Sequence, residues 1–150
     1  MSKIVFVLNG PNLNLLGKRQ PEIYGHDTLE DVARLCADAG AAFGIEIEQK
    51  QSNYEGQIVE WIHEAIEEGG AAIVINPAAF TFTSIAILDA LKMFPGPLIE
   101  LHISNIHRRE AIYHTSLVSP VATAVIAGLG PGGYPVAIRS MADLVTCPKA

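Results

Sequence analysis

The side chains with the clearest chemical potential lie in the polar stretch NGPNLNLLGKRQPEIYG, from Asn9 to Gly25. A tyrosine phenol, with a reference pKa of about 10, is a poor base at neutral pH. Lowering that pKa to about 7 needs roughly 4 kcal/mol, which one guanidinium about 4 Å away supplies at an effective dielectric of about 20. The stretch therefore predicts a proton-abstracting site in which Arg19, with Lys18 as the other nearby cation, holds Tyr24 ionised. The alternative is that Tyr24 packs its ring in the loop and Arg19 is solvated, the commoner state of both residue types.

A second reactive pair, Glu100 and His102, ends the apolar run LIELH. Residues two apart in a strand point to the same face, so these two side chains can touch. A carboxylate beside an imidazole fixes its tautomer and favours the protonated ring, which suits a general acid. A structural charge pair at a strand end is the alternative, and the position of the pair at the expected binding edge favours the functional interpretation.

Metal and phosphate chemistry find little support in the residue spacing. His102, His107 and His114 match no common ligand motif, and no cysteine or carboxylate completes a set. The glycine-rich segment 128–133 contains neither a GxGxxG fingerprint nor a P-loop lysine, so we expect a flexible loop before a helix. Phosphoryl transfer would require acidic Mg²⁺ ligands at the strand ends, where this chain has Asn9 and Asn76.

Length, charge and cysteine usage limit the class of protein. A chain of 150 residues that is 49% hydrophobic predicts a single catalytic domain spanning residues 1–150. The net charge of −6 argues against nucleic-acid or anionic-membrane partners. We expect no leader or membrane span, since no basic region precedes a long apolar run. The cysteines are Cys36 and Cys147, and a disulfide is not expected, which fits a cytoplasmic location.

The elements that must position these residues follow from alternating β-branched runs and helical patterns. We expect strands at 4–8, 45–48 (an edge strand), 71–75, 98–102 and 122–127. We expect helices at 28–44 (capped by Thr28 with Asp31), around 58–66 after a loop at 52–56, at 84–93 and at 135–144, with a short helix or turn at 108–114. The pattern predicts an α/β fold, a flavodoxin-like three-layer sandwich with a five-stranded parallel sheet.

Ligands of such sheets bind outside the carboxyl ends of the strands, where the chain order reverses. The polar residues expected at that edge are Asn9, Asn12, Arg19, Tyr24, Asn76, Glu100, His102, Ser104, Arg108 and Arg109. Polar residues from three separate strand ends are therefore expected to form one site.

Four sequence blocks resemble the type II 3-dehydroquinate dehydratase family over nearly the whole chain. They are LNGPNLNLLGKRQPEIYG at 8–25, INPAAFTFTS at 75–84, ELHISNIHRRE at 100–110 and SPVATAVIAGLGPGGY at 119–134. The resemblance implies anti elimination of water from 3-dehydroquinate through an enolate to give 3-dehydroshikimate, in the shikimate or quinate pathway. It implies no metal and no organic cofactor.

The resemblance also implies a role for each matching residue. Tyr24 would be the base, ionised by Arg19, and Asn12 would stabilise the enolate through a water. His102, oriented by Glu100, would protonate the departing hydroxyl. The substrate carboxylate would be held by Asn76 and by the backbone amides around Ile103 and Ser104. Arg109 would lie near the tyrosine and the active-site lid, the loop around Arg19. Family members form trimers, commonly four in a dodecamer, with Asp89 reaching a neighbouring subunit's site.

Two positions depart from the family pattern. The family usually has a histidine where this chain has Phe82 and an arginine where it has Tyr113, and both bind ring hydroxyls remote from the elimination. The expected partner is a cyclic hydroxy-ketone carboxylate. The alternatives are a paralogue that dehydrates a less hydroxylated β-hydroxy ketone acid, a non-catalytic protein that binds a ring carboxylate, and a flavin or nucleotide module.

Overall fold

The fold is built on a five-stranded parallel sheet. The computed structural model describes residues 3–146, apart from the side chain of Tyr24, so Cys147 lies outside the described residues. The strands are β1 (Lys3–Asn9), β2 (Ile45–Gln51), β3 (Ala72–Asn76), β4 (Leu98–His102) and β5 (Ala124–Ala127), in the order β2-β1-β3-β4-β5. This order confirms the expected flavodoxin-like α/β fold, and its reversal point lies between β1 and β3.

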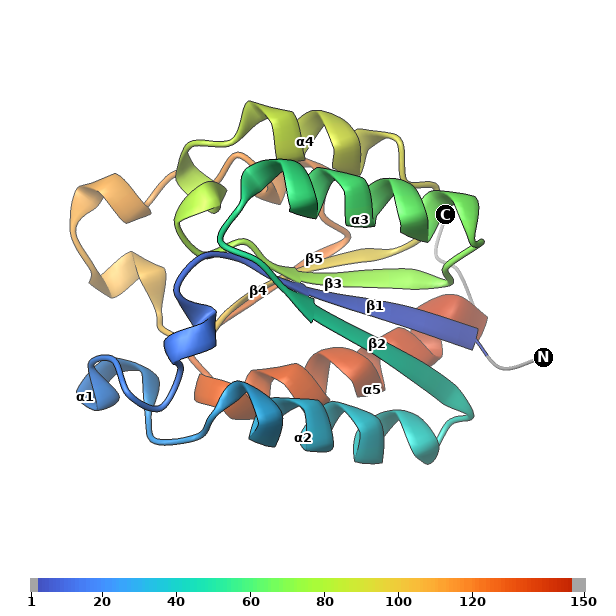
Figure 1. The fold of residues 1–150 in the computed structure, drawn as a ribbon, viewed down its shortest axis with the longest axis horizontal. Helices are drawn as coiled ribbons and strands as arrows, with labels where there is room; N and C mark the ends of the chain where they lie inside the picture. Colours follow the sequence, from blue (N-terminus) through green and yellow to red (C-terminus); the bar gives the residue numbers. More distant parts are fainter. Residues whose placement is uncertain (1–2, 147–150) are drawn as a thin grey trace.

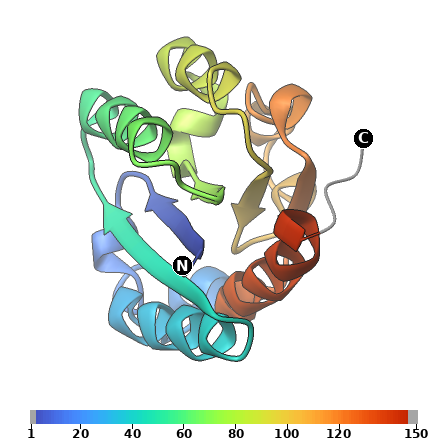
Figure 2. The same ribbon diagram turned by 90° about the vertical axis from the view of Figure 1, so that its right-hand side faces the viewer.

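Helices cover both faces of the sheet. Figure 1 shows α3 (Glu55–Glu67) and α4 (Ile85–Lys92) on one face, with α2 (Leu29–Ala41) and α5 (Gly133–Thr146) on the other. Figure 2 shows the same three layers from the amino-terminal side. Because both faces are covered, β3 and β4 are buried along their whole length.

Alternation along the strands sends neighbouring residues into two different cores. Val5, Val7 and Val74 pack with α2 and α5, whereas Phe6 and Ile73 pack with α3 and α4. The same alternation carries Asn9 and Asn76 towards α5, and Glu100 and His102 towards the α4 side. The carboxyl ends of the strands thus receive polar groups from both faces.

Most expected elements are present, with shifted boundaries. Thr28 and Asp31 form the predicted capping box at the start of α2, and β2 lies at the sheet edge as expected. Helix α2 ends at Ala41 rather than near Gly44, α3 begins inside the expected loop 52–56, and β5 begins two residues later than expected. The segment 108–114 forms parts of two short 3₁₀ helices, Ile106–Arg108 and Ala111–Tyr113.

The stretch 9–25 is not the single long loop that its composition suggests. It contains a 3₁₀ turn, Leu13–Leu15, and the short helix α1, Pro21–Tyr24. Pro21 occupies the first turn of α1, where its fixed φ is helical and its missing N–H is not needed. None of the helices within 3–146 is long and apolar enough to cross a membrane.

Candidate active site

A pocket opens at the carboxyl ends of the strands, where the polar residues converge. It encloses about 110 Å³. Its predicted members are Asn12, Arg19, Asn76, Phe82, His102, Ile103, Ser104, Arg109 and Tyr113, and its other members are Pro11, Leu13, Leu16, Ala78, Ala79 and Ile106. The structure therefore brings together residues from the segments that follow β1, β3 and β4.

Glu100 and His102 form the expected pair beside this pocket. Glu100 is fully buried, and its Oε2 lies 2.5 Å from His102 Nε2. Its Oε1 accepts hydrogen bonds from the hydroxyls of Ser116 at 3.0 Å and Ser119 at 2.7 Å. Burial alone would raise the pKa of Glu100, but the bonds from His102, Ser119 and Ser116 together hold that pKa below its ordinary value of 4.5. The pair is therefore an ionised carboxylate that orients an imidazole, with Nδ1 left for a ligand.

Asn76 reaches the pocket from the opposite face of the sheet. Its Oδ1 accepts from the Ala78 N–H at 3.3 Å, and its Nδ2 donates to the Tyr134 hydroxyl at 3.0 Å. That hydroxyl donates to Asn9 Oδ1 at 2.6 Å. Asn9, Asn76 and Tyr134 are all buried, so the chain of bonds satisfies polar groups that would otherwise be costly inside the core.

The loops after β1 and β3 are joined by their backbones. Gly10 N–H donates to the Asn76 carbonyl at 2.8 Å, and a Cβ at Gly10 would lie 2.2 Å from the Pro77 oxygen. Asn12 and Ala78 both line the pocket with a left-handed backbone, at φ 69 and φ 52. Such conformations in residues other than glycine cost free energy and are found most often at functional sites.

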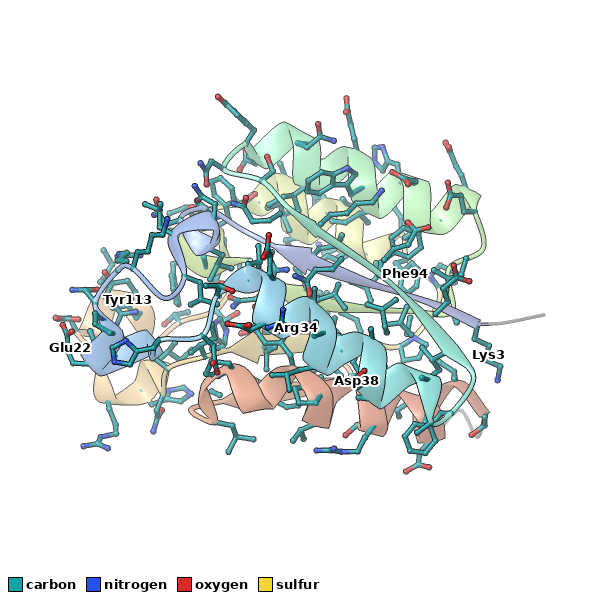
Figure 3. The ribbon with its side chains drawn as sticks, turned by 60° about the horizontal axis from the view of Figure 1, so that its bottom comes forward. Lys3, Glu22, Arg34, Asp38, Phe94 and Tyr113 are labelled. Atoms are coloured by element: carbon teal, nitrogen blue, oxygen red, sulfur yellow. The ribbon has the colours of Figure 1, made fainter. Side chains whose placement is uncertain are left out.

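Phe82 and Tyr113 form one side of the pocket, here named the aromatic wall. The ring of Phe82 stacks on the imidazole of His102 with centroids 6.4 Å apart, and Tyr113 meets Phe82 edge-on at 5.4 Å. The guanidinium carbon of Arg109 lies 4.1 Å from the centroid of the Tyr113 ring. In Figure 3, Tyr113 lies at the same end of the molecule as Glu22 of α1 and opposite Lys3. The wall offers aromatic surface directly beside the imidazole.

Comparison with known proteins decides the family. Residues 3–142 match the model of the family described as Dehydroquinase class II. The chain belongs to this family. It is similar to two proteins named 3-dehydroquinate dehydratase. The one from Cereibacter sphaeroides is 56% identical over 144 residues (96% of this chain, 97% of the relative), and the one from Variovorax paradoxus is 57% identical over 143 residues (93% and 98%). The crystal structure of the type II dehydroquinase from Propionibacterium acnes matches with a TM-score of 0.90 at 46% identity, over 95% of this chain and 97% of that one.

The predicted base and its electrostatic partner are Tyr24 and Arg19. Arg19 lines the pocket, and Tyr24 is the last residue of α1. The side chain of Tyr24 lies outside the described part of the chain, so its ionisation by Arg19 stays a prediction.

Four described residues that the sequence predicted at the site do not line the pocket: Asn9 and Glu100, which are buried behind it, and Arg108 and Asp89. Arg108 is exposed, and Asp89 lies on the outer side of α4, 3.5 Å from Lys92. A role for Asp89 in a neighbouring subunit stays a prediction.

The histidines do not gather around one point. His102 is buried beside Glu100, whereas His107 and His114 are exposed, with ring centroids 6.3 Å apart. His114 Nε2 lies 2.6 Å from the Arg109 carbonyl, which supports the backbone next to the aromatic wall.

Three polar residues around the site escaped sequence reasoning. Ser116 and Ser119 are separated from Glu100 by 16 and 19 residues, so only the tertiary fold brings them to it. The one available signal was that a glutamate in a buried strand must find donors. Tyr134 directly follows the glycine-rich segment, and the helix was expected to start one residue later, although α5 begins at Gly133.

Proposed function

We propose that the protein is a 3-dehydroquinate dehydratase, a hydro-lyase that eliminates water from 3-dehydroquinate to give 3-dehydroshikimate. The observation that carries this proposal is the buried Glu100–His102 pair beside a pocket that also contains Asn12, Arg19 and Asn76. Membership of the class II dehydroquinase family and the names of the similar proteins support it.

The reaction begins with removal of a proton next to the ketone. In the proposal the Tyr24 phenolate takes this proton, and Arg19 stabilises the phenolate electrostatically. The electron pair of the broken C–H bond moves onto the ketone oxygen and forms an enolate. Asn12, held by a 2.9 Å bond from its N–H to Asn53 Oδ1, binds a water that stabilises the enolate oxygen.

Collapse of the enolate then forms the ring double bond and breaks the bond to the tertiary hydroxyl. His102 donates a proton to that hydroxyl, which leaves as water, and Glu100 stabilises the imidazolium before the transfer. The substrate carboxylate is bound by Asn76 and by backbone amides near Ile103 and Ser104. Arg109 lies near Tyr24 and the active-site lid, and no metal or organic cofactor takes part in the proposed steps.

Formation of the conjugated enone product gives a direct test by ultraviolet absorbance. Purified protein should convert 3-dehydroquinate, and Tyr24→Phe should abolish the rate because a phenyl ring cannot accept a proton. Tyr54→Phe is the matched control, since Tyr54 is exposed at the start of α3 and away from the pocket. Binding of dehydroquinate by folded wild-type protein without product would contradict the proposal and favour a non-catalytic carboxylate-binding protein. A coloured preparation or a co-purifying nucleotide would instead indicate a flavin or nucleotide module.

The aromatic wall supports a second candidate, a dehydratase for a less hydroxylated β-hydroxy ketone acid. Phe82 offers no hydrogen-bonding group, and the Tyr113 ring is held between Phe82 and Arg109. A substrate hydroxyl left unpaired against Phe82 would cost about 1–3 kcal/mol. A substrate with C–H groups on that edge avoids this cost.

Turnover of dehydroquinate and of its deoxy analogue separates the two candidates. If the wall disfavours ring hydroxyls, the double variant Phe82→His with Tyr113→Arg should raise kcat/KM for dehydroquinate by roughly tenfold and lower it for the deoxy analogue. An unchanged preference in the folded double variant would contradict this account of the wall.

Assembly, location and pathway complete the proposal. By its family, the protein forms trimers and a dodecamer of four trimers, with Asp89 contributing to a neighbouring site. A cytoplasmic role in the shikimate pathway, or in quinate breakdown, fits the cysteine usage and the small carboxylate substrate.

A further inference from the structure

The buried chain of hydrogen bonds behind Asn76 has a direction. It runs from Asn76 through Tyr134 to Asn9, and Asn9 Nδ2 donates to the Lys50 carbonyl at 3.2 Å. A backbone carbonyl only accepts hydrogen bonds, so the Asn9 amide must turn its nitrogen to Lys50 and its oxygen to Tyr134. The direction is therefore fixed by the backbone of β2.

The fixed orientation of Asn9 determines every bond that follows. Asn9 Oδ1 can only accept, so the single hydroxyl proton of Tyr134 is committed to it at 2.6 Å. The Tyr134 oxygen must then accept from its other neighbour, which requires the nitrogen of Asn76 at 3.0 Å. The Ala78 N–H donates to the oxygen of the same amide, Asn76 Oδ1. Both contacts therefore require the same orientation of the Asn76 amide.

This orientation decides what the pocket offers to a ligand. An amide nitrogen carries two hydrogens, and one hydrogen of Asn76 Nδ2 is used by Tyr134. The second remains for a ligand, since Asn76 lines the pocket. Asn76 therefore presents a donor, which suits a carboxylate, rather than an acceptor.

We propose that Tyr134 is a positioning residue that fixes the Asn76 amide with its N–H towards the pocket, so that the site selects a carboxylate over a neutral carboxamide. The inference rests on the proposed role of Asn76 in holding the substrate carboxylate. Tyr134 touches no substrate itself, because it is fully buried behind the strand ends. Its ring packs in the α2–α5 core, and its hydroxyl carries the positioning role.

The experiment compares wild type with Tyr134→Phe, which keeps the ring and removes the hydroxyl. KM for dehydroquinate should rise roughly tenfold with kcat little changed, as expected for one lost hydrogen bond to a charged group. The preference for quinate over quinamide as competitive inhibitors should also fall, because the Asn76 amide, then held by the 3.3 Å bond from the Ala78 N–H without Tyr134, can more easily turn its oxygen to the carboxamide N–H. A purely structural tyrosine would weaken both inhibitors equally.

Ile138→Val is the matched control, since Ile138 is buried on the same helix and core and the change lowers stability without touching the amide chain. The proposal is overturned if Tyr134→Phe loses stability like this control while KM and the quinate preference stay at wild-type values. If Tyr134→Phe does not fold, Asn9→Leu removes the acceptor of the Tyr134 proton and should change the same preference.

Calorimetric measurement of quinate and quinamide binding tests the role of Tyr134 without requiring turnover, so it separates this inference from the proposed function. Wild-type protein that does not turn over dehydroquinate contradicts the proposed function. If that protein still prefers quinate, and Tyr134→Phe removes the preference, the positioning role stands. An equal loss for both ligands contradicts it.

Discussion

Glu100 is controlled by the atoms that approach each of its oxygens. Two serine hydroxyls donate to Oε1, and the imidazole of His102 meets Oε2, so the carboxylate has partners on both sides. A buried carboxylate surrounded by donors stays ionised, and an ionised neighbour stabilises an imidazolium. The proposed general acid, His102, is therefore paired with a carboxylate that stays ionised and buried.

Replacing Glu100 by glutamine tests whether that charge is used in catalysis. The amide has nearly the same shape but cannot stabilise a protonated His102, so Glu100→Gln should lower kcat by about 10²–10³ with a small change in KM. Steady-state enone formation measures both constants. Glu110→Gln, at an exposed position in the same sequence block, is the control. An unchanged kcat in folded Glu100→Gln would mean that the carboxylate has only a structural role.

The sequence identifies the reactive residues more reliably than it identifies the residues that support them. Glu100 and His102 are two apart in one strand, so strand geometry alone brings them together. Their serine partners lie in a distant segment, and Tyr134 reaches Asn76 across 58 residues, which no periodicity reveals. Local geometry is readable from a sequence, whereas contacts between remote segments depend on how the elements pack.

At the scale of elements, the site depends on how closely the loops after β1 and β3 approach. The two strands end in register, with Asn9 paired to Asn76, and Gly10 then lies directly against Pro77. Only a residue without Cβ fits there. This contact holds the segments that bring Asn12 and Asn76 to the same pocket.

Gly10→Ala should therefore damage both stability and binding. The added methyl group forces the loops apart, which should cost about 1–3 kcal/mol of unfolding free energy and raise KM. Gly56→Ala is the contrasting variant, because Gly56 lies in the first turn of α3 with open space around its Cβ position. That change should be neutral or stabilise by up to about 1 kcal/mol. Urea unfolding and enone kinetics measure the two effects, and equal behaviour of the variants would contradict the close-packing argument.

The buried strands were predictable because a parallel strand covered on both faces needs apolar residues at nearly every position. The interval 98–102 matches β4 at both ends. Helix α1 was not predicted, because a glutamine followed by a proline is typical of a turn. In the structure Gln20, with φ 42, precedes the helix and Pro21 is its first residue. Boundaries are set by capping and tertiary contacts, which composition represents poorly.

At the scale of the whole molecule, the sheet separates the site into two halves that are stabilised differently. Glu100 and His102 belong to the α4 side, whereas Asn9, Asn76 and Tyr134 form a neutral network on the α5 side. Only the first half carries a buried charge, so lowering the pH destabilises that half and not the neutral network. Because the pKa of Glu100 is lowered from 4.5, the folded state binds fewer protons than the unfolded state just below that pH. The stability from Glu100 is fully present above pH 4.5 and is lost as pH falls through the lower pKa of the folded state.

The double variant Ser116→Ala with Ser119→Ala tests whether the ionised Glu100 makes the stability of the protein depend on pH. It removes two hydrogen bonds to a charged group, so it should lower the unfolding free energy at pH 7 by at least about 2 kcal/mol. Without these donors the pKa of Glu100 rises, because only the hydrogen bond and charge of His102 then oppose the effect of burial, and the folded state of the variant resists protonation less. The stability difference from wild type should therefore be largest near neutral pH and shrink as pH falls below 4.5. Urea unfolding from pH 7 to pH 3 measures the difference, and Ser140→Ala, whose hydroxyl bonds the Val136 carbonyl within α5, should show one that does not change with pH. A difference for the double variant that stays constant over this range would mean that the serines act on packing and not on the buried charge.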